Sequence, residues 1–164
     1  FVPMFLVSYV NAHPELKLNI SLWTFGIIAA GSLGCIGGGM VAKRFGSALV
    51  AFVQLSFSGI CCLLSGLIFK APPELFLVYM IFWGIVVVGD SPQFSTLVAH
   101  TAPKELVGSA LTIVNCIGFF ITIISIQLMT SLIAVIPSDY VFTFLIIGPI
   151  IGLVSLRPLV RSRI

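Results

Sequence analysis

Charged residues are scarce in this chain of 164 residues, where Asp, Glu, Lys and Arg together make up 8%. Hydrophobic residues make up 59%, and a soluble domain of this size could not stay in solution with that balance. The basic residues are scattered among short connections and form no patch of the kind that binds nucleic acid. The scarcity of charge therefore indicates an integral membrane protein and argues against a nucleic-acid partner.

The sequence also lacks the patterns that carry enzyme, metal or cofactor chemistry. It has no His-Glu-x-x-His run, no phosphate-binding Gly-Lys-Ser or Gly-Lys-Thr loop, and no arrangement of Ser, His and Asp typical of a hydrolase. Its cysteines lie inside apolar stretches, without the spacing of a metal site or of a disulfide framework. We therefore expect a protein that is not an enzyme, binds no metal and uses no cofactor.

What the chain has is a series of apolar runs, each long enough to cross roughly 30 Å of hydrocarbon as a helix. The runs show no alternation of period two, so the sequence predicts an all-α integral membrane protein and not a transmembrane barrel. We expect 1–164 to form one membrane domain. The expected spans are about 20–42, 47–69, 75–98, 108–134 and 140–156, preceded by an apolar stretch at 1–12 and followed by a tail at 157–164.

Residues 1–12 cover only about half of a membrane crossing. The chain opens at Phe1 without an initiator Met or a basic leader. We therefore expect this stretch to be the end of a truncated helix whose earlier part precedes Phe1.

Positive charge gathers on one side of the expected topology. When the connections are placed alternately on two sides, Lys17 and Lys70 fall on one side and the other Lys and Arg residues on the opposite side. The positive-inside rule places the richer side, and with it the C-terminus, in the cytoplasm. The compact loops favour the plasma membrane, with a bacterial inner membrane as the expected location. The cytoplasmic residues would be Lys43, Arg44, Lys104, Arg157, Arg161 and Arg163.

Two connections carry recognisable motifs. The turn between the first two spans is Gly39-Met-Val-Ala-Lys43-Arg44-Phe-Gly46, and a later segment, Pro103-Lys-Glu-Leu-Val-Gly108-Ser-Ala-Leu, leads into the fourth span. Before the first motif, Gly34 and Gly38 have the small-xxx-small spacing that favours contact between membrane helices.

Both segments resemble motifs of the major facilitator superfamily, whose transporters contain two six-helix bundles around a central cavity. That family carries Gly-x-x-x-Asp-Arg-x-Gly between the second and third helices of each half; Gly39, Arg44 and Gly46 match it, and Lys43 replaces the acid. The later segment is similar to the family's entry to the fifth helix of a half, with Val107 where an arginine often stands. The likeness covers essentially the whole chain and implies the C-terminal six-helix bundle, from the end of helix seven through helix twelve.

The resemblance implies secondary active transport of a small solute by alternating access, as a permease that works as a symporter or an antiporter. It implies that this bundle moves within the bilayer against an N-terminal half of the same chain. We expect protons to drive the transport. It also implies that helices seven, eight, ten and eleven line the cavity, whereas nine and twelve, here the spans at 47–69 and 140–156, face lipid.

Asp90 is the only acid inside an expected span, and a carboxylate at such a depth costs about 2.5 kcal/mol or more. We expect it to carry a proton or to contact a cation; the alternative is an inward-facing acid that hydrogen-bonds to a serine or to a neighbouring helix. Pro92 should bend the helix here. Helical spacing puts further residues on the stripe that we expect to face the cavity. They are Tyr79, Trp83, Gln93 and Leu97.

A second polar stripe follows the fourth span, and Asn115 is its most polar member. Its amide could orient a substrate because it both donates and accepts, or it could bridge two helices. The stripe contains Gly108, Thr112, Asn115, Phe119, Thr122 and Ile126, of which Thr112, Asn115 and Phe119 are the expected cavity residues.

Two other function classes stay open. A small polytopic scaffold or assembly subunit without transport activity would use its glycine faces to dock partner helices. A membrane-embedded enzyme would depend on Asp90 and His100 as acid and base, but these lie about 15 Å apart along a helix, too far to act together.

Overall fold

A computed structural model describes residues 2–133 and 141–161 of the chain. This part of the chain is helical and contains no strand. Five helical segments within it are long and apolar enough to cross a membrane, which supports an all-α membrane protein. The elements are α1 (Val2–Ala12), α2 (Ile20–Phe45), α3 (Ser47–Ile68), α4 (Pro73–Gly89), α5 (Ser91–Thr101), η1 (Lys104–Leu106), α6 (Val107–Ile133), η2 (Phe142–Ile146) and α8 (Ile147–Arg161).

The first two membrane helices are joined by a single residue. Gly46 has a φ of 87°, a backbone conformation that costs little only for glycine, and its N–H donates to the Ala42 carbonyl oxygen over 2.8 Å. At the other end of α2, the Asn19 side chain accepts a hydrogen bond from the Leu22 N–H over 3.1 Å. Local chemistry therefore defines both ends of α2 and the sharp reversal into α3.

Helices α2 and α4 pack backbone against backbone through glycine. A Cβ atom added to Gly34 of α2 would overlap the carbonyl oxygen of Ile85 in α4. A Cβ atom added to Gly84 of α4 would lie 2.8 Å from the carbonyl oxygen of Ile27 in α2. The two helices can approach this closely only because both positions lack a side chain.

An aromatic cluster joins α1 to the connection between α3 and α4. The rings of Tyr9 and Phe76 are stacked, with their centroids 3.7 Å apart, and the Tyr9 hydroxyl donates to the Ala71 carbonyl oxygen over 2.6 Å. Phe5 meets Trp83 edge to face with centroids 6.0 Å apart. These contacts pack α1 against the end of the bundle at which α4 begins.

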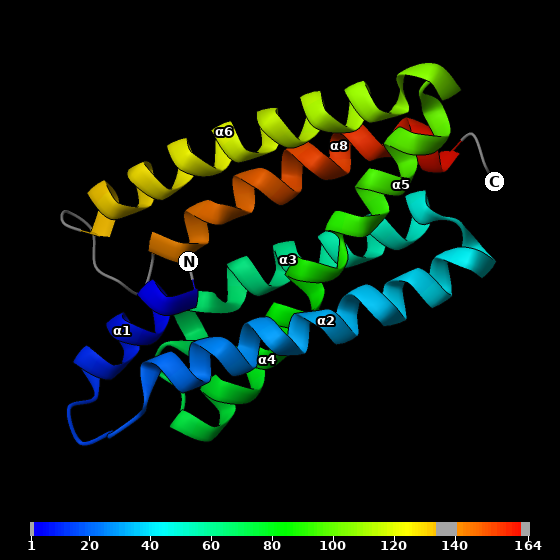
Figure 1. The fold of residues 1–164 in the computed structure, drawn as a ribbon. Helices are drawn as coiled ribbons and strands as arrows, with labels where there is room; N and C mark the ends of the chain where they lie inside the picture. Colours follow the sequence, from blue (N-terminus) through cyan, green and yellow to red (C-terminus); the bar gives the residue numbers. More distant parts are fainter. Residues whose placement is uncertain (1, 134–140, 162–164) are drawn as a thin grey trace.

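The segments that carry most of the basic residues lie at one end of the molecule. Figure 1 shows the α2–α3 turn, the α5–α6 connection and the C-terminal end of α8 on its right, and the α1–α2 connection at the opposite end. These segments carry Lys43 and Arg44 in the last turn of α2, Lys104 in η1 and Arg157 in α8, four of the residues that the alternating topology puts on one side. Arg163 lies outside the described residues.

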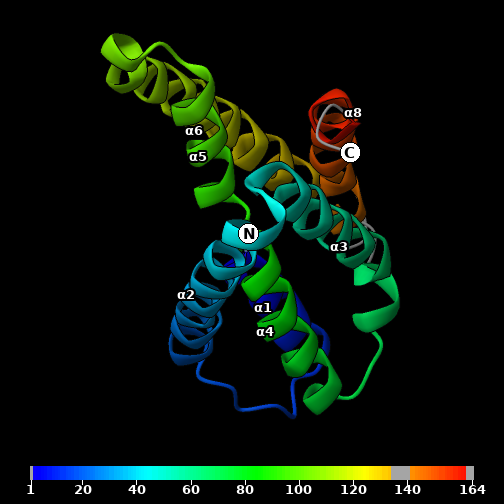
Figure 2. The same cartoon turned by 90° about the vertical axis from the view of Figure 1, so that its right-hand side faces the viewer.

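Helix α6 stands partly apart from the bundle. Figure 2 shows α5 and the adjoining part of α6 diverging from α3 and α8. Met129 is the one buried residue of α6, and the helix packs mainly against α5 and η1. By contrast, α3 has nine buried residues on the side that packs in the bundle, and its opposite side exposes Phe57, Leu63 and Leu67. The implication that this helix faces lipid stays a prediction.

The last span differs from the single helix expected at 140–156. Its described part begins with the 3-10 turn η2, and α8 continues through Pro158 to Arg161, so the helix extends into the expected tail. Residues 134–140, which would end the fourth span and begin the fifth, lie outside the described residues, as do residues 162–164 of the tail.

Candidate functional site

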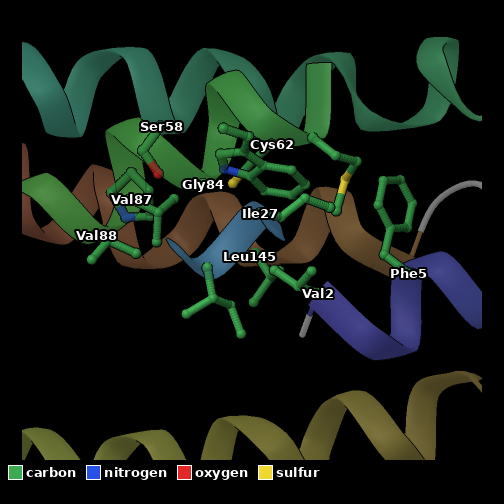
Figure 3. A pocket seen from close by; sticks show the side chains of 13 residues that line it. Val2, Phe5, Ile27, Ser58, Cys62, Gly84, Val87, Val88 and Leu145 are labelled. Atoms are coloured by element: carbon green, nitrogen blue, oxygen red, sulfur yellow. The ribbon is translucent and has the colours of Figure 1, made fainter. Parts of the chain in front are cut away.

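A cavity of about 370 Å³ lies between the helices, and Figure 3 shows the side chains around it. Helix α4 contributes the largest share of the lining, and α1, α2, α3, η2 and α8 supply the rest. Among the described residues, no charged side chain lines the cavity, and the polar groups are Ser58, Cys62 and the indole of Trp83. The lining residues are Val2, Phe5, Ile27, Ile28, Ser58, Cys62, Met80, Trp83, Gly84, Val87, Val88, Leu145 and Pro149.

Helix α6 contributes nothing to this lining, whereas α3 and α8 do. Ser58 and Cys62 are one turn apart on α3, so they present a hydroxyl and a thiol from one face of that helix. Pro149 of α8 packs against α3 beside them, 3.3 Å from the position of a Cβ atom on Gly59. This cavity lies within one bundle, whereas the cavity that the resemblance implies lies between two bundles, so the implied set of cavity helices stays a prediction.

Trp83 is the one residue of the Asp90 stripe that lines the cavity. Its side chain is 9% exposed, and its Nε1 atom is buried without a hydrogen-bond partner among the described residues. An indole nitrogen can only donate, so it needs an acceptor that the described part of the protein does not supply.

Tyr79 is buried but does not line the cavity. Its hydroxyl donates a hydrogen bond to the carbonyl oxygen of Cys61 in α3. The hydroxyl therefore connects α4 to α3 and cannot donate the same proton to a solute.

The long span that contains Asp90 bends at that residue, which itself keeps helical φ and ψ angles of −77° and −32°. α4 ends at Gly89 and α5 begins at Ser91, within a segment of 29 residues from Pro73 to Thr101. Asp90 is half-buried, and the Ser91 hydroxyl lies 3.4 Å from its Oδ1 atom. The bend expected from Pro92 is therefore present, but Asp90 itself is not among the lining residues.

A cysteine from a neighbouring helix replaces a backbone hydrogen bond that is missing at this bend. Proline has no N–H, so Pro92 cannot donate to the carbonyl of Val88 one turn earlier. The Cys35 thiol of α2 lies 3.5 Å from that carbonyl oxygen and donates to it. Replacement of a lost helix hydrogen bond by a neighbouring side chain is what the membrane interior requires. In the sequence, Cys35 lies inside an apolar stretch, and nothing there indicates this contact.

Gln93 is 2% exposed and belongs to a second polar cluster, away from the cavity lining. Its Nε2 atom lies 3.2 Å from the position of a Cβ atom on Gly38, and Nε2 of Gln54 lies 2.8 Å from the same position. The Oε1 atom of Gln54 is buried without a partner among the described residues. Two amides from α3 and α5 thus pack on a glycine of α2. In the sequence, Gln54 is only a polar residue in an otherwise apolar stretch.

The structure does not bring Thr112, Asn115 and Phe119 of α6 to the cavity. All three are exposed, and the Thr112 hydroxyl donates to the Gly108 carbonyl of its own helix over 2.9 Å. Leu97, the last residue of the Asp90 stripe, packs instead against a small cluster formed by α3 and α8.

The glycine-rich motif lies at the end of α2. Lys43 and Arg44 are exposed in the last turn, where positive charge interacts favourably with the helix dipole. A Cβ atom on Gly39 would meet nothing within 4 Å, whereas Gly46 forms the positive-φ turn. The motif therefore holds the reversal between α2 and α3 at the basic end of the bundle.

Comparisons of the chain with protein-family models, with curated proteins and with solved structures find no match. The likeness to the major facilitator superfamily therefore stays a prediction from the two motifs.

Proposed function

We propose that this chain moves a small solute across a membrane, as one bundle of a secondary transporter that works by alternating access. The observation that carries the proposal is the proline bend in the span at Asp90, directly beyond the cavity wall formed by Val87 and Val88. Departures from a regular helix next to a central cavity are a recurring feature of transporter sites. No residue arrangement of the described part suggests catalysis.

The bend lies between the cavity wall at the end of α4 and the carboxylate of Asp90. Movement of α5 relative to α4 would shift the end of α4, and with it two residues of the cavity wall. Asp90 lies at the joint, so a change in its charge would alter the interactions that hold the two segments together. We therefore propose that protons, exchanged at Asp90, couple to the movement of the solute.

The exposed surface of α6 favours the presence of a partner that contacts this helix within the membrane. Asn115 is exposed on a helix that crosses the apolar part of the bilayer, where an amide without a partner is unfavourable. We propose that an N-terminal half of the same transporter supplies the facing helices.

The test is transport by the intact protein in proteoliposomes. A pH difference across the membrane should drive accumulation of a transported solute, and Asp90→Asn should abolish the effect of the pH difference. Glu74→Gln is the matched control, because Glu74 is an exposed carboxylate in the first turn of the same span. If Asp90→Asn keeps the full dependence on the pH difference, the coupling proposal is wrong.

The same surface of α6 also favours a scaffold or assembly subunit, the second candidate. A scaffold would use α6 to bind other membrane proteins and would carry no solute. Proteoliposomes that contain intact protein and show no flux of any tested solute, together with stoichiometric co-purification of another membrane protein through α6, would support the scaffold and exclude the transporter.

A further inference from the structure

We propose that Cys35 is a positioning residue at the bend: its thiol holds the last turn of α4 on α2 and thereby keeps Val88 in the cavity wall. The inference rests on the proposed function, because it names the contact that restrains movement of the bend near Asp90. Cys35 itself does not line the cavity, so it acts on the cavity only through Val88.

The carbonyl of Val88 has lost its usual donor. Pro92 lacks the N–H that would reach this carbonyl in a regular helix. The N–H of Gln93, the next one along the chain, donates instead to the carbonyl oxygen of Asp90 over 3.0 Å. An unpaired carbonyl is unfavourable in the membrane interior. The Cys35 thiol, 3.5 Å from the Val88 oxygen, is therefore the donor that the bend requires.

The side chain of Val88 is held by the same face of α2. Gly31 and Cys35 are one turn apart on that helix, so they face the same neighbour. A Cβ atom added to Gly31 would lie 2.7 Å from the Cβ atom of Val88. Figure 3 shows Val88 among the side chains around the cavity, so both contacts act on the cavity wall.

The contacts of α2 differ on the two sides of the bend. Before it, Gly34 lies against the backbone of α4, and a Cβ atom on Gly89 would lie 3.0 Å from the carbonyl oxygen of Gly34. Beyond it, the α5 atom nearest to the Cβ position of Gly38 is the amide nitrogen at the end of the Gln93 side chain. A side chain can change its rotamer, whereas a helix backbone cannot. Movement at the bend therefore meets resistance at the α2–α4 contact, to which the thiol adds a directional hydrogen bond.

A double-mutant cycle tests this hydrogen bond in the intact protein, with unfolding by SDS as the measurement. Cys116→Ala is the matched control for helix propensity, because Cys116 is exposed on α6. Relative to this control, Cys35→Ala should raise the equilibrium constant of unfolding about threefold, the average effect of a hydrogen bond between membrane helices. Pro92→Ala restores an N–H to the Val88 carbonyl, so in that background the same comparison should give a factor of about one.

Infrared spectroscopy observes the thiol directly, and a purely packing role of Cys35 would not change this readout. The spectrum of the wild-type protein minus that of Cys35→Ala isolates the S–H stretch of Cys35, and subtraction of the Cys116→Ala spectrum isolates that of Cys116. An S–H group that donates vibrates at a lower frequency than a free one, so the Cys35 band should lie below the Cys116 band. This comparison stays decisive if Pro92→Ala does not fold.

Hydrogen–deuterium exchange measures the restraint on the bend. Asp90→Asn removes the charge at the bend, and its effect on exchange in the last turn of α4 should be about threefold larger in the Cys35→Ala protein than in the wild type, because the restraining bond is then absent. An equal effect of Asp90→Asn in both proteins would overturn the inference. So would an equal effect of Cys35→Ala with and without Pro92, or a Cys35 band at the frequency of the Cys116 band.

Failure of the proposed function gives a different result. Proteoliposomes without flux of any tested solute would exclude the transporter, although the cycle and the infrared band would still show the thiol bond. Flux driven by a pH difference, together with an equal effect of Cys35→Ala in both backgrounds, would leave the transporter and exclude this role of Cys35.

Discussion

Gly34 lies directly against the backbone of α4, and we expect its replacement by alanine to force α2 and α4 apart. The added Cβ atom would overlap the Ile85 carbonyl oxygen and lie 2.9 Å from the Ile85 carbonyl carbon. Both atoms belong to a helix backbone, so neither can move aside by a change of rotamer. Gly37, on the same helix, offers a matched control because a Cβ atom there would meet nothing within 4 Å.

The two substitutions should change the free energy of unfolding in opposite directions. Alanine in place of glycine stabilises a helix by roughly 0.5–1 kcal/mol, and this is the whole expected effect at Gly37. At Gly34 the overlap adds a packing penalty of about 1–3 kcal/mol, the usual range for an overfilled interior, and at a backbone contact we expect the upper half. Gly34→Ala should therefore lower the free energy of unfolding by about 1–2 kcal/mol, whereas Gly37→Ala should raise it.

The assay is reversible unfolding of the intact protein in mixed micelles, with the denaturing detergent SDS added in steps and helix content followed by circular dichroism. Comparison of Gly34→Ala with Gly37→Ala cancels the helix propensity that both share. Equal stability of the two variants would refute the close α2–α4 contact and the packing described above.

Two further substitutions test other interior contacts with the same assay. Tyr9→Phe keeps the stacked ring but removes the hydrogen bond to the Ala71 carbonyl, so it should lower the free energy of unfolding by about 1 kcal/mol; no change would mean that the bond does not hold α1 in place. Gln54→Leu should be neutral or stabilising, since it removes a buried amide oxygen that has no partner among the described residues, and a loss of more than about 2 kcal/mol would show that this amide is paired.

Membrane spans were predictable because their signals are local. The apolar runs, the asparagine before α2 and the glycine between α2 and α3 act within a few residues of the chain. The grouping of basic connections at one end follows from the same alternation of spans, and Figure 1 shows it in the described part. Length and composition are enough for these features, whatever the helices pack against.

Which residues share a site depended on packing between helices. Helical spacing placed Tyr79, Trp83 and Gln93 on one stripe, and all three are buried, but only Trp83 lines the cavity. It could not show that the Tyr79 hydroxyl would meet the carbonyl of Cys61, or that Gln93 would lie near Gln54. A stripe of residues defines only a direction from the axis of its own helix. Which other helix lies in that direction depends on the packing of the whole bundle.

The sequence alone thus determined the class of protein, the helices and the unusual position of an acid within a span. Tertiary structure decided that Trp83, and not Asp90 or Asn115, lines the cavity, and that the cavity is apolar. The physical reason is packing between helices. Glycines bring α2 and α4 close together, the Tyr79 hydroxyl joins α4 to α3, and α6 diverges from the bundle.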